Sequence, residues 1–500
     1  MRRFALGTED LGFGEHRLEK LNELRAKGMD PFAIERYDRT HLANDVIAHF
    51  DQLENKDICL AGRIVSFRPM GKASFAHIQD FSGKIQVYIK ADAVGPELYG
   101  IVEALDIGDI IGVRGTVGKT KTGETTVFVS EFEILAKSLR PIPIGKQKGD
   151  KEWYALEDIE QRYRQRYLDL IVHGEVHDTM VKRSQIVRAV REFLESEGFL
   201  EVETPVLQAV AGGAAAKPFT TYYNALDHEF HLRISLELYL KRLIVGGFEK
   251  IYEIGRVFRN EGLSTRHNPE FTLLELYQAY TNLEDMMDLV ERMFVYVCKR
   301  VHGGTTLTYQ GHTVDLTPPW RRLPLLEGIR QYTGITSDQF STLESAKAAG
   351  ESLGLPMQHE TTIGGIVDKI HERFVQPNLI QPTFVTEYPV DISPLAKKDP
   401  NNPTMTRRFE PYIAAQECGN AFSEINDPLD QRERFVAQAK MRAAGDEEAH
   451  PMDEDFLRAL EYGMPPTGGL GIGIDRMVML FTDSPSIRDV ILFPQLKPEK

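Results

Sequence analysis

Two neighbouring segments in the middle of the chain carry residue types that bind phosphate and cations. Residues 251–259 and 270–277 alternate with period two, which predicts the two strands of a hairpin. The polar loop between them contains Arg266 and His267. Period two places four residues of the second strand on one face, namely Phe271, Leu273, Glu275 and Tyr277. A carboxylate and a phenol beside an aromatic ring suit a pocket that binds a cation and stacks on a flat ring.

A second segment, residues 408–427, contains two glutamates seven positions apart, Glu410 and Glu417. A two-residue turn at Ile413 and Ala414 would place the two carboxylates directly opposite each other across a hairpin. Facing carboxylates repel unless a cation or a shared proton lies between them, and Mg²⁺ prefers such ligands. The alternative is a pair of surface glutamates on an edge strand. Three later residues share one strand face: Asn420, Phe422 and Glu424.

A third segment is rich in glycine and ends in a charged pair. Residues 468–473 contain the glycines, Asp475 and Arg476 follow, and we expect a helix from Met477 to Phe481. Glycines allow close approach of the backbone to a ligand, and an arginine at a helix start can stack on a purine or bind phosphate. A salt bridge between Arg476 and Asp475 is the alternative. The three segments together favour phosphoryl-group chemistry on a nucleotide with a cationic co-substrate.

The N-terminal third of the chain has a different pattern. From residue 57 to residue 134, about five short strands alternate with period two between tight turns, which predicts a small closed barrel of the OB-fold type. Such barrels stack single-stranded bases on exposed aromatic rings. Phe75 and Gln86 could stack on a base and read its edge, whereas a core aromatic and a solvated strand residue are the alternatives. Residues 118–125 resemble a phosphate-binding P-loop, but Glu124 stands where lysine is needed.

The rest of the chain has the pattern of an α+β catalytic region. An amphipathic helix over residues 180–197 is followed by a strand over residues 199–204 that Pro205 ends. This unit suits a subunit interface, although ordinary packing is the alternative. Residues 336–374 are helix-rich and are interpreted as an insertion. The fold class is therefore α+β multidomain, an N-terminal OB-fold barrel followed by a catalytic domain with an antiparallel sheet flanked by helices. The expected limits are a helical extension (1–56), the barrel (57–143), a linker (144–167) and the catalytic domain (168–500).

Composition narrows the class of protein. Of 500 residues, 42% are hydrophobic and 27% are charged, which is a globular balance for roughly two to four domains. No apolar run is long enough to cross a bilayer. Cys59, Cys298 and Cys418 lie far apart, which argues against a disulfide framework and a cysteine zinc site. The net charge of −15 disfavours indiscriminate nucleic-acid binding, so a nucleic-acid partner must be argued from sites. We expect a soluble, cytoplasmic protein.

These segments resemble the class II aminoacyl-tRNA synthetases. FRNEGLSTRHNPEFTLLELY is similar to motif 2, GLGIGIDR is similar to motif 3, and residues 199–205 resemble the end of motif 1, the dimer-forming element. The N-terminal barrel marks the subclass of the lysine, aspartate and asparagine enzymes. Within it, residues 212–219 and 237–241 resemble the bacterial lysine enzymes. The resemblance implies a homodimer that uses ATP, L-lysine and tRNA(Lys), and a membrane partner is not expected.

The resemblance also implies roles for matching positions, with Arg259 and Arg476 as the catalytic residues. The ATP contacts fall on Arg259, Glu261, Arg266, His267, Asn268, Phe271, Glu410 and Arg476. The lysine contacts fall on Gly213, Glu237, Arg259, Glu275, Tyr277, Asn420, Phe422 and Glu424. Glu410 and Glu417 would hold Mg²⁺, while Phe75 and Gln86 would bind the central anticodon uridine. The implied reaction forms lysyl-adenylate and pyrophosphate from lysine and ATP, and then transfers lysine to the 3′ end of the tRNA.

Alternatives to this interpretation follow from the same residues. Glu275 and Glu424 disfavour an aspartate or asparagine enzyme, because a site for either side chain should not surround it with two glutamates. A ligase that attaches lysine to a protein would lack the anticodon barrel. A non-catalytic RNA-binding relative is a further alternative, and the arginines and carboxylates kept at the motif positions argue against it. The chain departs from many relatives at five positions: Ala414, Ala415, Gln416, Cys418 and Ala421.

Overall fold

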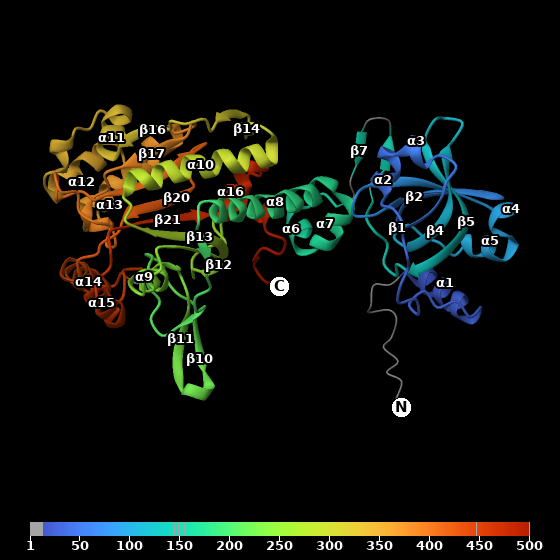
Figure 1. Ribbon diagram of the computed structural model, residues 1–500, viewed down its shortest axis with the longest axis horizontal. Helices are drawn as coiled ribbons and strands as arrows, with labels where there is room; N and C mark the ends of the chain where they lie inside the picture. Colours follow the sequence, from blue (N-terminus) through green and yellow to red (C-terminus); the bar gives the residue numbers. More distant parts are fainter. Residues whose placement is uncertain (1–13, 145, 149–150, 154–155, 447, 500) are drawn as a thin grey trace. The chain divides into compact units, whose positions relative to one another are not determined.

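The computed structural model describes residues 14–144, 146–148, 151–153, 156–446 and 448–499 (Figure 1). The chain separates into two compact units, Met1–Asp158 and Ile159–Lys500. This division falls inside the expected linker, while the finer domain limits stay a prediction. The start of the expected N-terminal extension, residues 1–13, lies outside the described part of the chain. Among the described helices, none has the length and apolar character needed to span a membrane.

A closed five-stranded barrel forms the core of the first unit. Its strands are β1 (Asp57–Met70), β2 (Ala73–Gln79), β3 (Lys84–Lys90), β4 (Ile110–Lys119) and β5 (Thr125–Ala136). β1 pairs with both β2 and β4, and β3 runs parallel to β5, so the barrel has the order β1-β2-β3-β5-β4. Ile85, Val87 and Ile89 of β3 alternate into the buried interior, as the period-two pattern predicts. The OB-fold prediction is confirmed.

Short helices surround the barrel. They are α1 (Glu15–Ala26), α2 (Ala43–Ala48), α3 (Phe50–Leu53), α4 (Ala91–Val94) and α5 (Pro96–Val102). Leu24, Ala43 and Val46 of these helices belong to the same buried cluster as the barrel interior. Two further strands, β6 (Lys146–Lys148) and β7 (Lys151–Trp153), pair with each other. The described part of the extension before the barrel contains three helices, α1, α2 and α3, with an irregular stretch between α1 and α2.

A nine-stranded sheet forms the centre of the second unit, in the order β16-β17-β18-β20-β21-β13-β12-β8 with β19 paired to β18. Its strands are β8 (Leu200–Glu201), β12 (Lys250–Phe258), β13 (Glu270–Ala279), β16 (Arg321–Pro324), β17 (Thr383–Thr386), β18 (Arg408–Ile413), β19 (Gln416–Glu417), β20 (Gly419–Ser423) and β21 (Thr467–Gly473). The pairs are antiparallel except β16–β17 and β12–β8. The predicted class of catalytic domain is confirmed.

Three helices pack on one face of this sheet, and three others pack on part of the opposite face. α8 (Gly174–Ser196), α10 (Leu283–His302) and α16 (Ile474–Phe481) share one buried cluster with Leu274 and Leu276 of β13. Glu275 and Tyr277 alternate with these leucines and therefore point to the opposite face. α9 (Glu237–Val245), α14 (Pro428–Ala443) and α15 (Glu454–Glu461) contribute to a separate cluster that contains Tyr277.

The chain between β16 and β17 is helical. It contains α11 (Leu325–Thr333), η3 (Ser337–Phe340), α12 (Leu343–Ser352), α13 (Ile363–Ile370), η4 (His371–Val375) and η5 (Gln376–Asn378). Because β16 and β17 are parallel neighbours, this segment forms their crossover connection. Its apolar residues, among them Met357 and Ile366, form one buried cluster with Leu323 of β16, Val385 of β17 and Tyr412 of β18. Residues 336–374 lie within this helical crossover, and their interpretation as an insertion stays a prediction.

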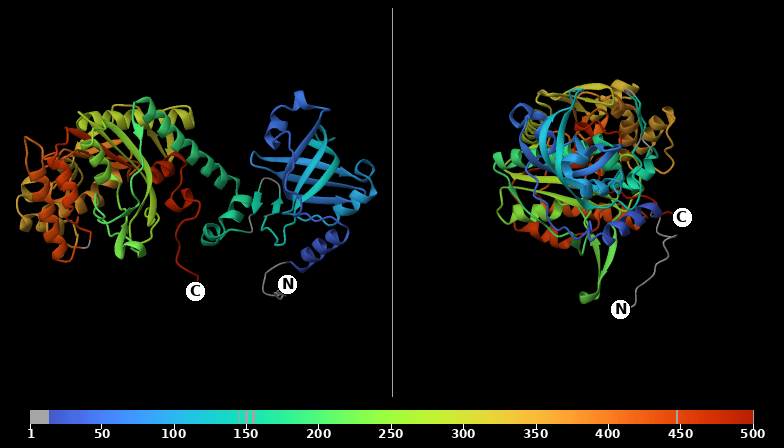
Figure 2. Two further views of the ribbon diagram at one scale, coloured as in Figure 1. Left: turned by 60° about the horizontal axis from the view of Figure 1, so that its bottom comes forward. Right: turned by 90° about the vertical axis from the view of Figure 1, so that its right-hand side faces the viewer.

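Smaller elements complete the second unit. They are α6 (Ile159–Arg164), α7 (Arg166–Val172), β9 (Leu207–Gln208), β10 (Thr220–Tyr223), η2 (Asn224–Leu226), β11 (His228–Leu232), β14 (Thr306–Tyr309), β15 (His312–Asp315), η6 (Val390–Ile392) and α17 (Ile487–Val490). The hairpin β10–β11 projects from the unit in both views (Figures 1 and 2). β11 also pairs with β9, which joins the projecting hairpin to the segment after the predicted motif 1 strand.

Two sequence expectations need correction. The glycine-rich run forms a central strand, β21, between β13 and β20, and the helix after it begins at Ile474 instead of Met477. Sequence reasoning missed the strand because glycine is depleted in strands. The glycines serve close packing, since a Cβ at Gly468 would lie 2.9 Å from Met286 Cγ. The strand expected over residues 199–204 is only two residues long, as β8.

Candidate active site

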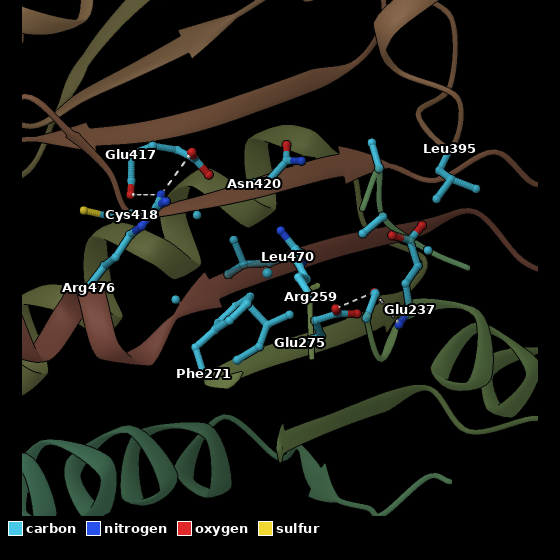
Figure 3. Close-up of a pocket in the computed structure, with 18 of the residues that line it drawn as sticks. Glu237, Arg259, Phe271, Glu275, Leu395, Glu417, Cys418, Asn420, Leu470 and Arg476 are labelled. Atoms are coloured by element: carbon cyan, nitrogen blue, oxygen red, sulfur yellow. Dashed lines mark hydrogen bonds and ion pairs between the residues drawn. The ribbon is translucent and has the colours of Figure 1, made fainter. Parts of the chain in front are cut away.

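A cavity of about 470 Å³ lies on the face of the sheet opposite α8, α10 and α16. Residues from β13, β20 and β21 line its floor. Figure 3 shows Glu237 and Glu275 toward one end and Arg476 and Glu417 toward the other, with Arg259 between them. The segments singled out by their chemistry therefore meet in one cavity, with carboxylates at one end and arginines along its length.

The loop between β12 and β13 is held by its own serine. The Ser264 hydroxyl accepts hydrogen bonds from the backbone N–H groups of Arg266 (3.1 Å) and His267 (3.0 Å), and it lies 3.0 Å from His267 Nδ1. Burial lowers the pKa of His267, and nearby Arg476 lowers it further, so the imidazole is neutral at pH 7. The loop thus presents Arg266 and a neutral imidazole to the cavity.

Arg259 lies at the centre of the cavity. Its guanidinium carbon is 5.1 Å from the centroid of the Phe271 ring, and its Nε donates a hydrogen bond to the backbone oxygen of Ile234 at 3.4 Å. Burial lowers the pKa of Arg259, but an arginine stays protonated in proteins. Within the described part of the chain it forms no ion pair with a carboxylate, so its charge is available to an anionic ligand.

Arg476 and Asp475 have different partners, so the expected alternative of a salt bridge between them is wrong. Arg476 Nη1 donates to the backbone oxygen of Glu417 (2.9 Å) and to its Oε2 (3.0 Å). Asp475 pairs instead with Arg183 (2.6 Å) and accepts from the backbone N–H of Thr272 (2.6 Å). Asp475 and Arg476 are successive residues of the first turn of α16, about 100° apart around the helix axis, so their side chains reach different partners.

The expected geometry of Glu410 and Glu417 is also wrong. The turn lies at Ala414 and Ala415, whose φ values are 51° and 61°, and it pairs Glu417 with Tyr412. Both residues are left-handed, as a two-residue hairpin turn requires, so the turn is one position later than predicted. The two glutamates therefore do not face each other across the hairpin. Both nevertheless line a second cavity of about 240 Å³, which also contains Arg266 and His267.

The surroundings of the two glutamates fit a magnesium ion bound partly by substrate. Glu410 Oε1 accepts from Arg408 (2.6 Å), and its Oε2 accepts from the hydroxyl groups of Tyr388 and Tyr412 (2.7 Å each). Glu417 is half-exposed toward the cavity. The described residues contain no set of three acidic, histidine or cysteine side chains close enough to hold a metal unaided. Mg²⁺ binds in this way, through one or two carboxylates plus waters and phosphate oxygens.

The other end of the cavity is strongly acidic. Glu275 Oε1 accepts from the Ser235 hydroxyl (2.7 Å) and the Leu236 N–H (3.0 Å), and Tyr277 donates to Glu275 Oε2 (3.2 Å). Burial raises the pKa of Glu275 to about 7, and burial raises that of Glu424 to about 8. Burial disfavours their charged forms, and a cationic ligand at this end would favour the ionised carboxylates.

The remaining predicted residues lie in or beside the same cavity. Asn420 Oδ1 accepts from Arg408 Nε at 3.0 Å, and the Arg408 guanidinium lies 5.8 Å from the Phe422 ring centroid. Asn268 is buried in the wall of the cavity, where it donates to the Glu270 backbone oxygen (2.6 Å) and accepts from the backbone N–H of Gln495 (3.2 Å). Two more predicted residues line the cavity: Gly213 and Glu261.

Sequence reasoning missed several residues that organise the site. Arg408 contacts three of its members, and Tyr388 and Tyr412 orient Glu410. Lys241 is fully buried beside Glu237 and Glu424. The sequence could have pointed to Lys241, since it lies four residues after Glu237 and the two residues therefore share one helix face. No sequence pattern pointed to Tyr388, because the segment that carries it reaches Glu410 only in the folded chain.

The barrel presents a separate group of aromatic and polar residues. The Phe75 ring centroid lies 4.6 Å from that of Tyr88, which lies 5.7 Å from that of Phe128. Phe75 is only partly buried and lies outside the barrel core. Gln86 is 9% exposed, and its amide accepts from Thr126 (2.8 Å) and donates to Glu124 (2.7 Å). Sequence reasoning missed Glu124 as a partner of Gln86. The face combines stacking rings with an oriented amide, as base recognition needs.

The antiparallel sheet and its arginine-lined cavity define a class II aminoacyl-tRNA synthetase. The family described as tRNA synthetases class II (D, K and N) matches residues 158–497, and the OB-fold nucleic acid binding domain matches residues 58–141. The chain is 56% identical over 484 residues to the lysine–tRNA ligase of Moorella thermoacetica (97% of each chain). It is 52% identical over 504 residues to that of Shouchella clausii (99% of each). The chain belongs to the lysine–tRNA ligase family and is an aminoacyl-tRNA ligase.

Proposed function

We propose that this enzyme activates L-lysine with ATP to lysyl-adenylate and pyrophosphate, and then transfers lysine to the 3′ end of tRNA(Lys). The observation that carries the proposal is the charge distribution of one cavity. Three buried carboxylates, Glu237, Glu275 and Glu424, gather at one end, while Arg259 and Arg476 lie along the rest. A zwitterion with a second ammonium group fits this arrangement, with its carboxylate directed to the arginines.

Lysine is placed with its two ammonium groups at the acidic end. Gly213 and Glu237 receive the α-ammonium group, and Asn420 and Arg259 bind the carboxylate. The ε-ammonium group is surrounded by three residues: Glu275, Tyr277 and Glu424. Phe422 packs on the aliphatic stem. This placement is supported by Glu424 Oε1, which is buried and has no hydrogen-bond partner among the described residues. An orphaned buried acceptor is costly, and a bound ammonium group would satisfy it.

ATP is placed at the arginine-rich end. Phe271 and Arg476 sandwich the adenine, Glu261 and Asn268 contribute further contacts, and Arg266 and His267 meet the outer phosphates. Glu410 and Glu417 hold Mg²⁺, which when bound neutralises charge on the phosphate oxygens. The fixed charges of Arg259 and Arg266 support this placement, since arginine binds phosphate through its planar fork of donors.

The chemistry needs positioning and charge stabilisation but no enzyme nucleophile. The lysine carboxylate attacks the α-phosphorus of ATP in line, the bond to the pyrophosphate oxygen breaks, and pyrophosphate leaves. Arg259 stabilises the negative charge that develops on the α-phosphate oxygens. The terminal ribose hydroxyl of the tRNA, which we take to be the 3′-hydroxyl, then attacks the adenylate carbonyl and releases AMP. The barrel contributes Phe75 as a stacking surface and Gln86 as a reader of the central anticodon uridine.

We further propose that the enzyme works as a homodimer in the cytoplasm, where tRNA is charged. Apolar side chains are exposed around the edge strand β8 and the projecting hairpin, including Leu200 (51%), Leu207 (46%) and Leu226 (58%). Such a group of exposed apolar residues at a sheet edge suits burial against a second copy. Light scattering coupled to size-exclusion chromatography tests this proposal, and a monomer at micromolar concentration would contradict it.

ATP–pyrophosphate exchange without tRNA tests the proposed reaction. The assay measures incorporation of labelled pyrophosphate into ATP with magnesium and each standard amino acid in turn. Exchange with lysine alone is the expected result. Exchange with aspartate or asparagine would overturn the assignment of the acidic pocket and keep the class of enzyme. A folded protein without exchange for any amino acid would instead favour a non-catalytic RNA-binding role.

A further inference from the structure

Lys241 has an unusual place in the second unit. Its side chain is fully buried, and its ammonium group pairs with Glu237 Oε1 and with Glu424 Oε2. The Phe456 ring lies beneath it, with the centroid 5.9 Å from Nζ. Glu237 is proposed to receive the α-ammonium group of lysine, and Glu424 is proposed to receive its ε-ammonium group. One internal ammonium group therefore bridges the two groups that bind the substrate's two ammonium groups.

The second oxygen of each bridged carboxylate is left for a ligand. Neither oxygen of Glu424 has a hydrogen-bond partner among the described residues, although Oε2 forms the ion pair with Lys241, and no described residue donates a hydrogen bond to Glu237 Oε2. Both side chains line the cavity. Lys241 thus occupies one side of each carboxylate and orients the other side toward the space where lysine is placed.

The charges in this region balance for a dication. Glu237, Glu275 and Glu424 contribute three formal negative charges, and Lys241 contributes one positive charge, which leaves −2. The substrate's two ammonium groups match that sum. Burial lowers the pKa of His450 to about 4, so this neighbour adds no charge at pH 7. The pKa of Tyr277 is raised well above its usual value by burial, so it is neutral too, and Arg408 pairs with Glu410.

We propose that Lys241 is a positioning residue for the amino-acid substrate, because its ammonium group holds Glu237 and Glu424 at the spacing and orientation that the α- and ε-ammonium groups of lysine require. The inference rests on the proposed function of the cavity and adds a residue to it. Lys241 does not touch the reacting atoms, and it acts through the two carboxylates.

Electrostatics indicate what its removal would do. Burial raises the pKa of Glu237 and of Glu424, and the Lys241 ammonium group opposes that effect at both carboxylates. Without it, three neighbouring buried carboxylates would repel one another and take up protons at neutral pH. Lysine binding would then have to displace those protons. Affinity should fall most at pH 7 and recover as the pH rises.

The test is the Lys241→Met variant, assayed by lysine-dependent ATP–pyrophosphate exchange. At pH 7 we expect KM for lysine to rise at least tenfold while KM for ATP stays within twofold. Between pH 7 and pH 9, KM for lysine should fall by a larger factor in the variant than in the wild type. Lys299→Met, at an exposed position near the end of α10, is the matched control and should behave as the wild type. An unchanged KM for lysine, or an unchanged pH slope, would overturn the proposal.

A second variant covers the case in which Lys241→Met does not fold, since removing one partner of a buried pair is strongly destabilising. Lys241→Met combined with Glu237→Gln keeps the formal charge at −2 and is compared with Glu237→Gln alone. The double variant should show the steeper pH dependence of KM for lysine, and equal slopes would overturn the proposal. A wild type without lysine-dependent exchange would contradict the proposed function itself. A wild type with exchange and a Lys241→Met variant with lower kcat alone would contradict only the role of Lys241.

Discussion

Arg476 and Glu417 are joined by two hydrogen bonds, since Arg476 Nη1 donates to the backbone oxygen of Glu417 at 2.9 Å and to its Oε2 at 3.0 Å. The pair connects the first turn of α16 to the short strand β19, which lie 59 residues apart in the chain. One residue is proposed to bind adenine and the other magnesium. The contact therefore couples the position of the adenine site to the position of the metal site.

Loss of Arg476 should weaken ATP binding selectively. Arg476→Ala removes the proposed stacking partner of adenine and frees Glu417, so we expect KM for ATP to rise about tenfold or more and exchange to fall by about 10²-fold. Lysine binding, measured by isothermal titration calorimetry, should change less than threefold. Arg458→Ala, on the exposed side of α15, is the control. Equal losses for lysine and ATP would contradict the proposed division of the cavity.

Loss of Arg259 should act on the chemical step. Arg259→Ala should lower lysine-dependent exchange by about 10²–10³-fold, the usual effect of removing a donor that stabilises developing charge. The circular dichroism spectrum and thermal midpoint should stay near those of the wild type, because Arg259 forms no ion pair with the described carboxylates. Near-normal turnover with a native spectrum would show that another group stabilises the α-phosphate.

Lysine affinity should increase with pH between about 6 and 9. In the free enzyme, burial raises the pKa of Glu275 to about 7 and that of Glu424 to about 8, so both are partly protonated at neutral pH. A bound ammonium group favours their ionised forms, so binding releases protons and becomes tighter as the pH rises through these values. Calorimetry in buffers of different ionisation enthalpy measures the protons released. An affinity that is flat or falls over this range would exclude these carboxylates as the ammonium ligands.

Substitutions on the barrel face that carries Phe75 and Gln86 should affect tRNA charging but not lysine activation. Phe75→Ala removes a stacking surface worth about 1–3 kcal/mol per base, so KM for tRNA should rise about tenfold or more. ATP–pyrophosphate exchange without tRNA should be unchanged. Phe81→Ala is a matched control, since Phe81 is 66% exposed in the turn between β2 and β3. A normal KM for tRNA in Phe75→Ala would remove this face from the anticodon site.

A glycine in the turn at Ala414 and Ala415 should stabilise the catalytic unit. Ala415 has a φ of 61°, a conformation that costs a residue with a Cβ about 1 kcal/mol relative to glycine. Ala415→Gly should therefore raise the thermal midpoint of the catalytic unit slightly, by about 1–3 °C. Ala437→Gly, in the exposed middle of α14, should lower it, because glycine destabilises helices. If both variants lower the midpoint, the left-handed turn is not a source of strain.

Local patterns predicted several features that the structure confirms. The period-two order of β13 assigned Glu275 and Tyr277 to one face and Leu274 and Leu276 to the other, because successive strand residues point in opposite directions. The barrel was predictable for the same reason, since Ile85, Val87 and Ile89 had to share an interior. These features follow from the extended backbone of a strand and from the alternation of polar and apolar side chains along it. Both are local properties that can be read from the sequence.

The register of the β18–β19 hairpin and the partners of the charged residues could be determined only from the tertiary structure. The sequence by itself indicated a turn near Ala414 but misplaced it by one residue, which changes every cross-strand pair. It could not show that Asp475 pairs with Arg183, or that Lys241 bridges Glu237 and Glu424. The sequence thus determined which residues could do chemistry and which face each would occupy on its own element. Only the folded sheet decided which charges meet, because those contacts join segments far apart in the chain and depend on how the elements pack.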